Sequence, residues 1–159
     1  MVRRVTRWLT EDEHRAWRGL LQMTAQLDAR LARQLQEHSG LSRADYDVLV
    51  PLSEAADGRL RMFELGDELC WEQSRLSHHL SRMHKRGLVE REDCLSDRRG
   101  AFVVLTAAGQ AAIEKAAPSH VDAVRQLVFE GLTQAQVKAL GTVTAHVLAN
   151  LQQTLPARQ

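Results

Sequence analysis

The stretch SRLSHHLSRMHKRGLVER, residues 74–91, combines three histidines with five Arg or Lys residues and a single acid, Glu90. Such side chains can bind a metal ion, cover the solvated face of a helix, or contact nucleic acid. A helix that binds a metal uses histidines three or four positions apart, because those positions share one face. His78, His79 and His84 are separated by one, five and six positions. This spacing does not favour a metal site, and we expect no metal and no cofactor.

At helical spacing, residues 74–86 divide into two faces. Leu76, Leu80 and Met83 form a narrow apolar stripe, as expected of a buried side. The opposite side collects Ser74, His78, Ser81, Arg82 and Lys85, with Arg75 and His79 on its flank. Residues 73–91 carry a local charge of +4, whereas residues 61–72 carry −3. Positive charge is therefore concentrated on one helix, although a solvated amphipathic helix would show the same pattern.

The neighbouring segments decide between these readings. The sequence predicts a short helix over 42–55, in which Pro51 implies a bend or an early end, and another helix over 60–69. Gly87 ends the basic helix, LVERE alternates like a strand, and AFVVL returns as a second strand. Short helices followed by a hairpin are typical of a winged helix-turn-helix, whose second helix enters the major groove of DNA. This context favours DNA binding.

Each polar residue of the basic helix then has an expected role. Ser74 and Ser77 are short and allow close approach to DNA. Arg82 can donate to base edges or phosphates, and arginine is the best reader of guanine. Arg86 is expected at a phosphate, which positions the protein without reading sequence. The residues of this helix that we expect at the DNA are Ser74, Arg75, Ser77, His78, Arg82 and Lys85.

The hairpin tip SDRRG, residues 96–100, fits the same arrangement. Arg98 and Arg99 lie on a short projecting loop and are expected in the minor groove, whose narrow A·T tracts attract arginine. Asp97 makes sense beside them if its carboxylate accepts hydrogen bonds from Arg99 and fixes the direction of that guanidinium. A simple solvated turn, which also favours Asp and Gly, is the alternative.

Long helices are expected at both ends of the chain. Thr10 and Glu13 form a capping box, and an apolar stripe continues until Gly40. Thr133 and Gln136 begin the last helix in the same way. Between them, residues 107–130 are apolar at helical spacing, and Pro118 is expected to kink or break that helix. The predicted fold is mainly α with a small β-hairpin wing.

The composition excludes several classes of protein. The chain has 159 residues, 44% of them hydrophobic, and a net charge of only +1, so any affinity for nucleic acid must come from a local patch. Cys70 and Cys94 lack metal-type spacing and are expected as reduced thiols in a cytoplasmic protein, with Cys70 buried. No signal-peptide core and no membrane span of roughly 18 apolar residues appears. No catalytic constellation emerges either, so we expect no enzyme; the main alternative is a helical interaction module for an acidic partner.

The motifs SRLSHHLSRMHKRGLVERE and SDRRGAFVVLTAAG resemble the MarR family of bacterial transcription regulators. The resemblance extends over nearly the whole chain and is specific in its middle. It implies a homodimer that binds a palindromic operator in double-stranded DNA, with residues 1–40 and 107–159 as the dimerisation region and residues 41–106 as the winged helix-turn-helix lobe. It also implies DNA contacts by Ser74, Ser77, His78, Arg82, Asp97 and Arg99, although the family more often has a longer basic residue at the position of His78.

The resemblance further implies how such a protein is regulated. Many members are repressors that lose DNA affinity when a small phenolic or anionic ligand binds between the dimerisation region and the DNA-binding lobe. Side chains that such a crevice could use are His14, Arg15, Trp17, Tyr46 and Phe63, but the apolar ones are expected in the core and the others in solvent. The sequence therefore assigns no ligand-binding residues, and Cys94 near the wing is the candidate for oxidation.

Overall fold

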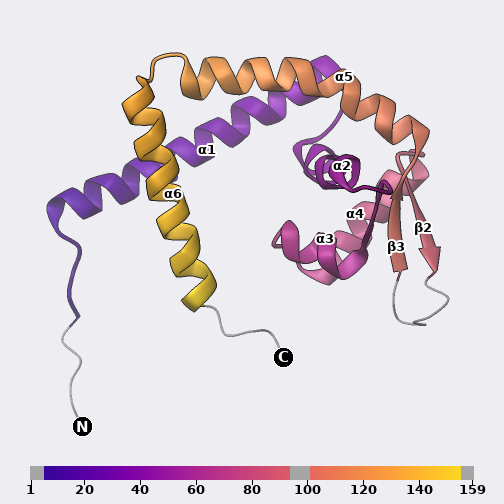
Figure 1. Cartoon of the computed structure of the whole chain (residues 1–159), viewed down its shortest axis with the longest axis horizontal. Coiled ribbons are helices and arrows are strands. Elements are labelled where there is room, and N and C mark those ends of the chain that lie inside the picture. The colour runs from indigo at the N-terminus through magenta and orange to yellow at the C-terminus, as the bar shows by residue number, and fades with distance from the viewer. Residues whose placement is uncertain (1–5, 94–100, 155–159) are drawn as a thin grey trace, which may run out of the picture. The chain divides into compact units, whose positions relative to one another are not determined.

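Helices dominate the part of the chain that the structure, a computed structural model, describes: residues 6–93 and 101–154. The elements are α1 (Glu11–Ser39), α2 (Arg43–Glu54), β1 (Arg59–Arg61), α3 (Met62–Glu68), α4 (Gln73–Lys85), β2 (Val89–Asp93), β3 (Ala101–Leu105), α5 (Ala107–Val124), the π-helical segment Arg125–Phe129 and α6 (Gln134–Thr154) (Figure 1). The chain divides into two compact units, Met1–His120 and Val121–Gln159. The predicted fold, a mainly helical winged helix-turn-helix, is confirmed.

The ends of α1 follow the sequence closely. Thr10 Oγ1 accepts from the Glu13 backbone N at 3.3 Å, and Glu13 Oε2 accepts from the Thr10 backbone N at 2.7 Å, so the capping box is complete. Gly40 ends the helix with a φ of +72°, a left-handed conformation that favours glycine. Only Leu31 and Leu35 are buried along α1, where its C-terminal part packs against α2.

The hydrophobic core of the first unit lies between α2, α3, α4 and the strands. Leu49, Leu52, Leu65, Val89 and Val103 are fully inaccessible to solvent and come from four different elements. Figure 1 shows α2, α3 and α4 gathered beside the β2–β3 hairpin. Since each of these short elements buries only one face, none would be stable without the others.

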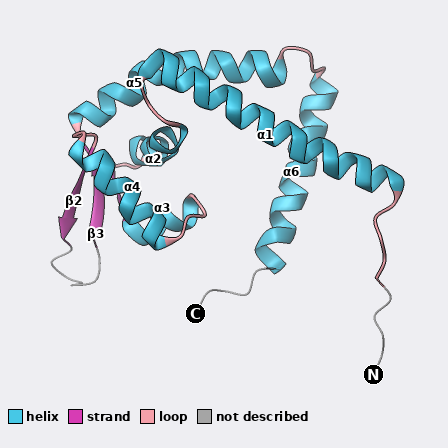
Figure 2. Ribbon diagram, turned by 180° about the vertical axis from the view of Figure 1, so that it is seen from behind, coloured by secondary structure: helices cyan, strands magenta, loops and turns pink. Residues whose placement is uncertain are grey.

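The sheet has three strands, one more than the sequence predicted. Its order is β1-β3-β2, all antiparallel, and Val103 pairs with Leu60 on one side and Arg91 on the other. Figure 2 shows β2 and β3 side by side next to α4. The prediction of one helix over 60–69 was wrong in its first residues, because Arg59–Arg61 pairs with β3 and the helix begins only at Met62. Long-range pairing overrides a weak local preference in such a short segment.

Pro51 and Pro118 both lie inside helices, so the early end expected at Pro51 and the break expected at Pro118 do not occur. α2 continues three residues beyond Pro51, whose carbonyl accepts from the Ala55 N–H at 3.1 Å. α5 runs through the exposed Pro118. The hydroxyl of Ser119, the next residue, accepts from Gln34 Nε2 of α1 at 3.1 Å and donates to the Ala116 carbonyl at 3.2 Å. Tertiary packing offsets the backbone hydrogen bond that each proline removes.

The turn between α3 and α4 corrects the expectation for Cys70. This residue is exposed, not buried, and has a φ of +52°. The Trp71 N–H donates to the Gly66 carbonyl and the Cys70 N–H to the Asp67 carbonyl, at 2.9 and 3.1 Å, which is a Schellman motif. Cys70 occupies the position where such a motif usually has glycine. The turn it makes directs Trp71 toward α4.

α5 begins in close contact with the end of α4 and the start of β2. Thr106 Oγ1 donates to the Gly87 carbonyl at 2.6 Å and accepts from the Gly109 N–H at 3.0 Å. A Cβ on Gly109 would lie 2.1 Å from the Leu88 carbonyl oxygen, so only glycine fits there. This contact fixes the hairpin relative to the first turn of α5.

Candidate nucleic-acid interface

The two faces predicted for α4 are both present. Leu76, Leu80 and Met83 are completely buried. The exposed residues include all five that the helical spacing placed on the outer face: Ser74, His78, Ser81, Arg82 and Lys85. Arg75 is exposed as well, and Ser77 is partly buried. One side of α4 thus anchors the helix, and the other presents hydroxyl, imidazole and cationic groups to solvent.

The three histidines of α4 have different surroundings. His78 is exposed on the outer face, and His84 Nδ1 lies 3.1 Å from the Val89 carbonyl oxygen. His79 was expected on the flank but is only 6% exposed and packs against α2. Within residues 6–93 and 101–154, no group of three His, Cys, Asp or Glu side chains is arranged to hold a metal ion. Each histidine of α4 therefore has its own separate set of contacts.

Asp45, near the start of α2, joins that helix to α4. Its carboxylate is 2% exposed; Oδ2 accepts from Arg86 Nη1 at 2.7 Å and from the Ser42 backbone N at 2.9 Å, and Oδ1 lies 3.2 Å from His79 Nε2. Burial by itself would raise the pKa of Asp45, but the bonds from His79, Arg86 and Ser42 outweigh it and hold the pKa well below its usual range. Asp45 is therefore a buried anion that attaches α4 to α2.

Arg86 has a structural role that its sequence position did not reveal. We expected it at a DNA phosphate, whereas its guanidinium forms the ion pair with Asp45, and 45% of its side chain remains exposed. Because the Arg86 guanidinium already neutralises a buried carboxylate, it is less available to bind a phosphate. Lys85, next to it, is exposed on the outer face.

Two arginines of α4 are held by aromatic or imidazole rings beneath them. The Arg75 guanidinium carbon lies 4.3 Å from the centre of the Trp71 ring, in a cation–π contact. Arg82 Nη2 lies 2.9 Å from His79 Nδ1. Trp71 and His79 in turn meet edge to face, with ring centres 5.5 Å apart. The two exposed guanidiniums thus rest on one pair of touching rings.

The tip of the wing lies outside the described residues. Asp97, Arg98 and Arg99, as well as Cys94, belong to that segment, so their predicted roles stay predictions. At the base of the wing, Arg59 and Arg61 of β1 place their guanidinium carbons 5.1 and 5.0 Å from the centre of the Phe102 ring. The sequence reading did not find this pair, because it assigned neither residue to a strand.

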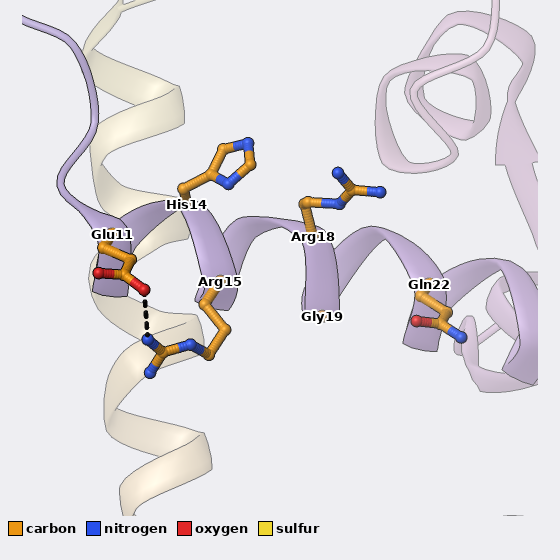
Figure 3. A pocket seen from close by; sticks show the side chains of 6 residues that line it. All are labelled: Glu11, His14, Arg15, Arg18, Gly19 and Gln22. Carbon is orange, nitrogen blue, oxygen red and sulfur yellow. Dashed lines mark hydrogen bonds and ion pairs between the residues drawn. The ribbon is translucent and has the colours of Figure 1, made fainter.

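A surface hollow lies along the first turns of α1 (Figure 3). Its lining is Glu11, His14, Arg15, Arg18, Gly19 and Gln22. Arg15 is already paired with Glu11 at 3.4 Å and with Asp12 at 3.1 Å. Of the crevice residues considered from sequence, His14 and Arg15 line it, whereas Tyr46 packs against the His120 ring at 4.4 Å. A hollow formed by one exposed helix does not define a ligand site.

None of the described helices is both long enough and apolar enough to cross a membrane.

A family model described as "MarR family" matches residues 39–100, the segment that contains α2, α3, α4 and the strand β2. This match includes every residue of the buried Asp45 network and the whole outer face of α4.

Solved structures extend the similarity to nearly the whole chain. Sco3205, a MarR family transcriptional regulator from Streptomyces coelicolor in complex with DNA, is 43% identical, with 97% of each chain covered and a TM-score of 0.90. AbsC, a MarR family transcriptional regulator from the same organism, is 40% identical over 94% of this chain and 100% of its own, with a TM-score of 0.88. A mutant MarR from E. coli complexed with operator DNA is 27% identical over 82% and 91% of the two chains, with a TM-score of 0.74. Together with the exposed basic face of α4, these similarities show that the chain belongs to the MarR family of DNA-binding transcriptional regulators, which are not enzymes.

Proposed function

We propose that two copies of this chain bind a palindromic operator, each inserting α4 into the major groove of one half-site. The observation that carries this proposal is the division of α4 into a completely buried apolar side and an exposed side with Arg75, His78, Arg82 and Lys85. Similar proteins have been solved with DNA, one of them with operator DNA. Two-fold symmetry would place the half-sites about 34–36 Å apart, one turn of the double helix.

The proposed contacts differ in what they contribute. Arg75 and Arg82 read base edges, His78 donates to a base edge or a phosphate, and Lys85 contacts phosphate. Ser74 and Ser77 permit the close approach. On the wing, Arg98 and Arg99 enter the minor groove, with Asp97 orienting Arg99.

The dimer is proposed from apolar surface that the single chain leaves uncovered. Every side chain from residue 134 to 153 is exposed, and α6 presents Val143, Val147, Leu148 and Leu151 to solvent. On α1, Trp17 is 50% exposed and lies near the exposed Leu20 and Leu21. Such large apolar surfaces mark association sites. We assign residues 1–40 and 107–159 to a dimerisation region that supports the DNA-binding lobe of residues 41–106.

Binding to DNA selected from a random pool tests this function. We expect the selected sequences to be palindromic and to bind at least about a thousandfold more tightly than random DNA, with an affinity that falls steeply as salt rises. An Arg82→Ala change should relax the preference at one base position per half-site, whereas Lys85→Ala should weaken binding to all sequences alike. Equal affinity for selected and random duplexes would instead favour the alternative, a helical module for an acidic protein partner.

We further propose that the protein is a repressor relieved by a small phenolic or anionic ligand. The family supports this expectation, and no ligand-binding residue is assigned. A panel of phenols and small carboxylates, added to the preformed DNA complex, tests it: release of DNA by one of them at a saturable concentration is expected. A reporter behind the selected operator should rise when the gene is deleted, and a fall would identify an activator.

A further inference from the structure

We propose that His79 is a positioning residue that sets the direction in which Arg82 meets DNA. This inference rests on the proposed function, because it concerns the layer directly beneath the proposed DNA-contacting face of α4. His79 itself is 6% exposed, so it lies behind that surface and acts on DNA only through the arginine.

The donor and acceptor roles along this contact follow from chemistry. A guanidinium has only donors, so the 2.9 Å contact between Arg82 Nη2 and His79 Nδ1 requires Nδ1 to accept. The ring proton must then be on Nε2, the nitrogen that lies 3.2 Å from Asp45 Oδ1. One tautomer of His79 thus presents an acceptor to Arg82 and an N–H beside Asp45, although the 3.2 Å approach to the carboxylate is not aligned as a hydrogen bond, and the ring lies between Arg82 and the buried carboxylate.

The ring of His79 is also held sideways. Trp71 meets it edge to face at an interplanar angle of 87°, and the face of the same Trp71 carries Arg75. Turning the imidazole by a half-turn would place carbon atoms opposite Arg82 and Asp45. Packing against Trp71, together with the polar groups of Arg82 and Asp45 that face the two ring nitrogens, therefore favours a single orientation of the His79 ring.

A fixed ring restricts an otherwise mobile side chain. Free arginine has many rotamers, and a bidentate contact to guanine needs its planar fork in one orientation. Because His79 accepts from one Nη, it leaves the remaining donors of Arg82 pointing outward in a defined way. The expected consequence concerns sequence discrimination rather than general affinity, since the charge of Arg82 is unchanged.

Two substitutions of His79 separate its two contacts. In His79→Asn the amide oxygen can occupy the place of Nδ1 and accept from Arg82, whereas in His79→Gln the amide nitrogen can occupy the place of Nε2 and donate to Asp45. We expect the Gln variant to lose roughly tenfold in the ratio of specific to random DNA affinity, with an unchanged salt dependence. The Asn variant should keep most of that ratio but unfold at a lower temperature. A loss of discrimination that is equal in both variants, or larger in Asn, would overturn the proposal.

A double-mutant cycle tests whether His79 acts through Arg82. In an Arg82→Ala background, His79→Gln should cause no further loss of discrimination, whereas in a matched Lys85→Ala background the tenfold loss should remain. Loss of the same size in both backgrounds would show that His79 does not act through Arg82. Failure of the proposed function is distinguishable, because the unsubstituted protein would then not prefer selected DNA at all.

A measurement on the unsubstituted protein makes the test independent of how well the variants fold. Nitrogen-15 NMR of the His79 imidazole should show a protonated Nε2 and an unprotonated Nδ1 at neutral pH, and the exposed Arg82→Ala change should shift the Nδ1 signal. The opposite tautomer, or an Nδ1 signal that ignores Arg82, would refute the proposed arrangement.

Discussion

Replacing Asp45 by Asn should strongly destabilise the DNA-binding lobe. The substitution keeps the shape and an acceptor in the place of Oδ2, which can still serve the Ser42 N–H and Arg86, but it removes the negative charge and places an amide NH₂ opposite His79 Nε2. Breaking a buried ion pair by removing one partner costs about 3–5 kcal/mol. Arg86 is 45% exposed and can turn toward water, so we expect a smaller cost than that range, about 2–3 kcal/mol. For a chain of this size the melting temperature should fall by about 4–12 °C.

The loss of stability caused by Asp45→Asn should depend on pH in a defined direction. Because the folded protein holds the pKa of Asp45 below its usual value, the stabilisation is complete above the unfolded pKa of about 3.9 and is lost as pH falls through the folded pKa. At pH 3 the original protein and the variant should differ in their free energies of unfolding by about 1.2 kcal/mol less than at pH 7, since each pKa unit corresponds to about 1.4 kcal/mol.

Urea unfolding followed by circular dichroism, at one protein concentration and at both pH values, measures these differences. Asp47→Asn is the matched control, because Asp47 lies on the same helix and pairs with Arg43 at 2.7 Å while remaining about one-third exposed. That control should lose less than about 1 kcal/mol. The reasoning is wrong if both variants lose the same amount, or if the Asp45 difference does not narrow on acidification.

Four further outcomes follow from features described above. Gly109→Ala should cost about 2–3 kcal/mol because its Cβ would meet a backbone carbonyl at 2.1 Å, whereas Gly141→Ala, with open space around it, should be neutral or stabilising in the same denaturation assay. Cys70→Gly should raise the free energy of unfolding by about 0.5–1 kcal/mol, since it relieves a φ of +52°; a lower stability would contradict the strain argument. Burial keeps the pKa of His120 below its usual value, so the unfolded chain takes up the proton first and stability falls as pH drops below about 6.5; His120→Gln should flatten that slope. Leu148→Lys should shift sedimentation toward the monomer at micromolar concentration, and an unchanged dimer would exclude this part of α6 from the interface.

Features that depend on local sequence were predicted well. The capping boxes at Thr10 and Thr133, the end of α1 at Gly40 and the apolar stripe of α4 all require only neighbours three or four positions away. For the same reason the outer face of α4 was correct residue by residue. Helical spacing alone decides which side chains share a face.

Features that depend on distant contacts were not predicted. β1 exists because β3 pairs with it, and α5 continues through Pro118, next to which Ser119 accepts a hydrogen bond from Gln34 of α1. The roles of Asp45 and Arg86 combine residues 41 positions apart, so no local pattern indicates them. Ser42 and Asp45 do have capping-box spacing, which could have identified one of the contacts of this carboxylate but not its burial.

The contacts beneath α4 have a consequence for redesigning its DNA preference. Exchanging only the outward side chains for those of another regulator would leave an incoming arginine at position 82 dependent on whatever ring lies at position 79. Since His79 is in turn held by Trp71 and Asp45, these three residues form a socket for the reading residues. We therefore expect a transferred DNA preference to match that of the donor regulator more closely when positions 45, 71 and 79 are exchanged together with the exposed residues of α4. Each DNA-contacting residue should be exchanged with the residues that support it.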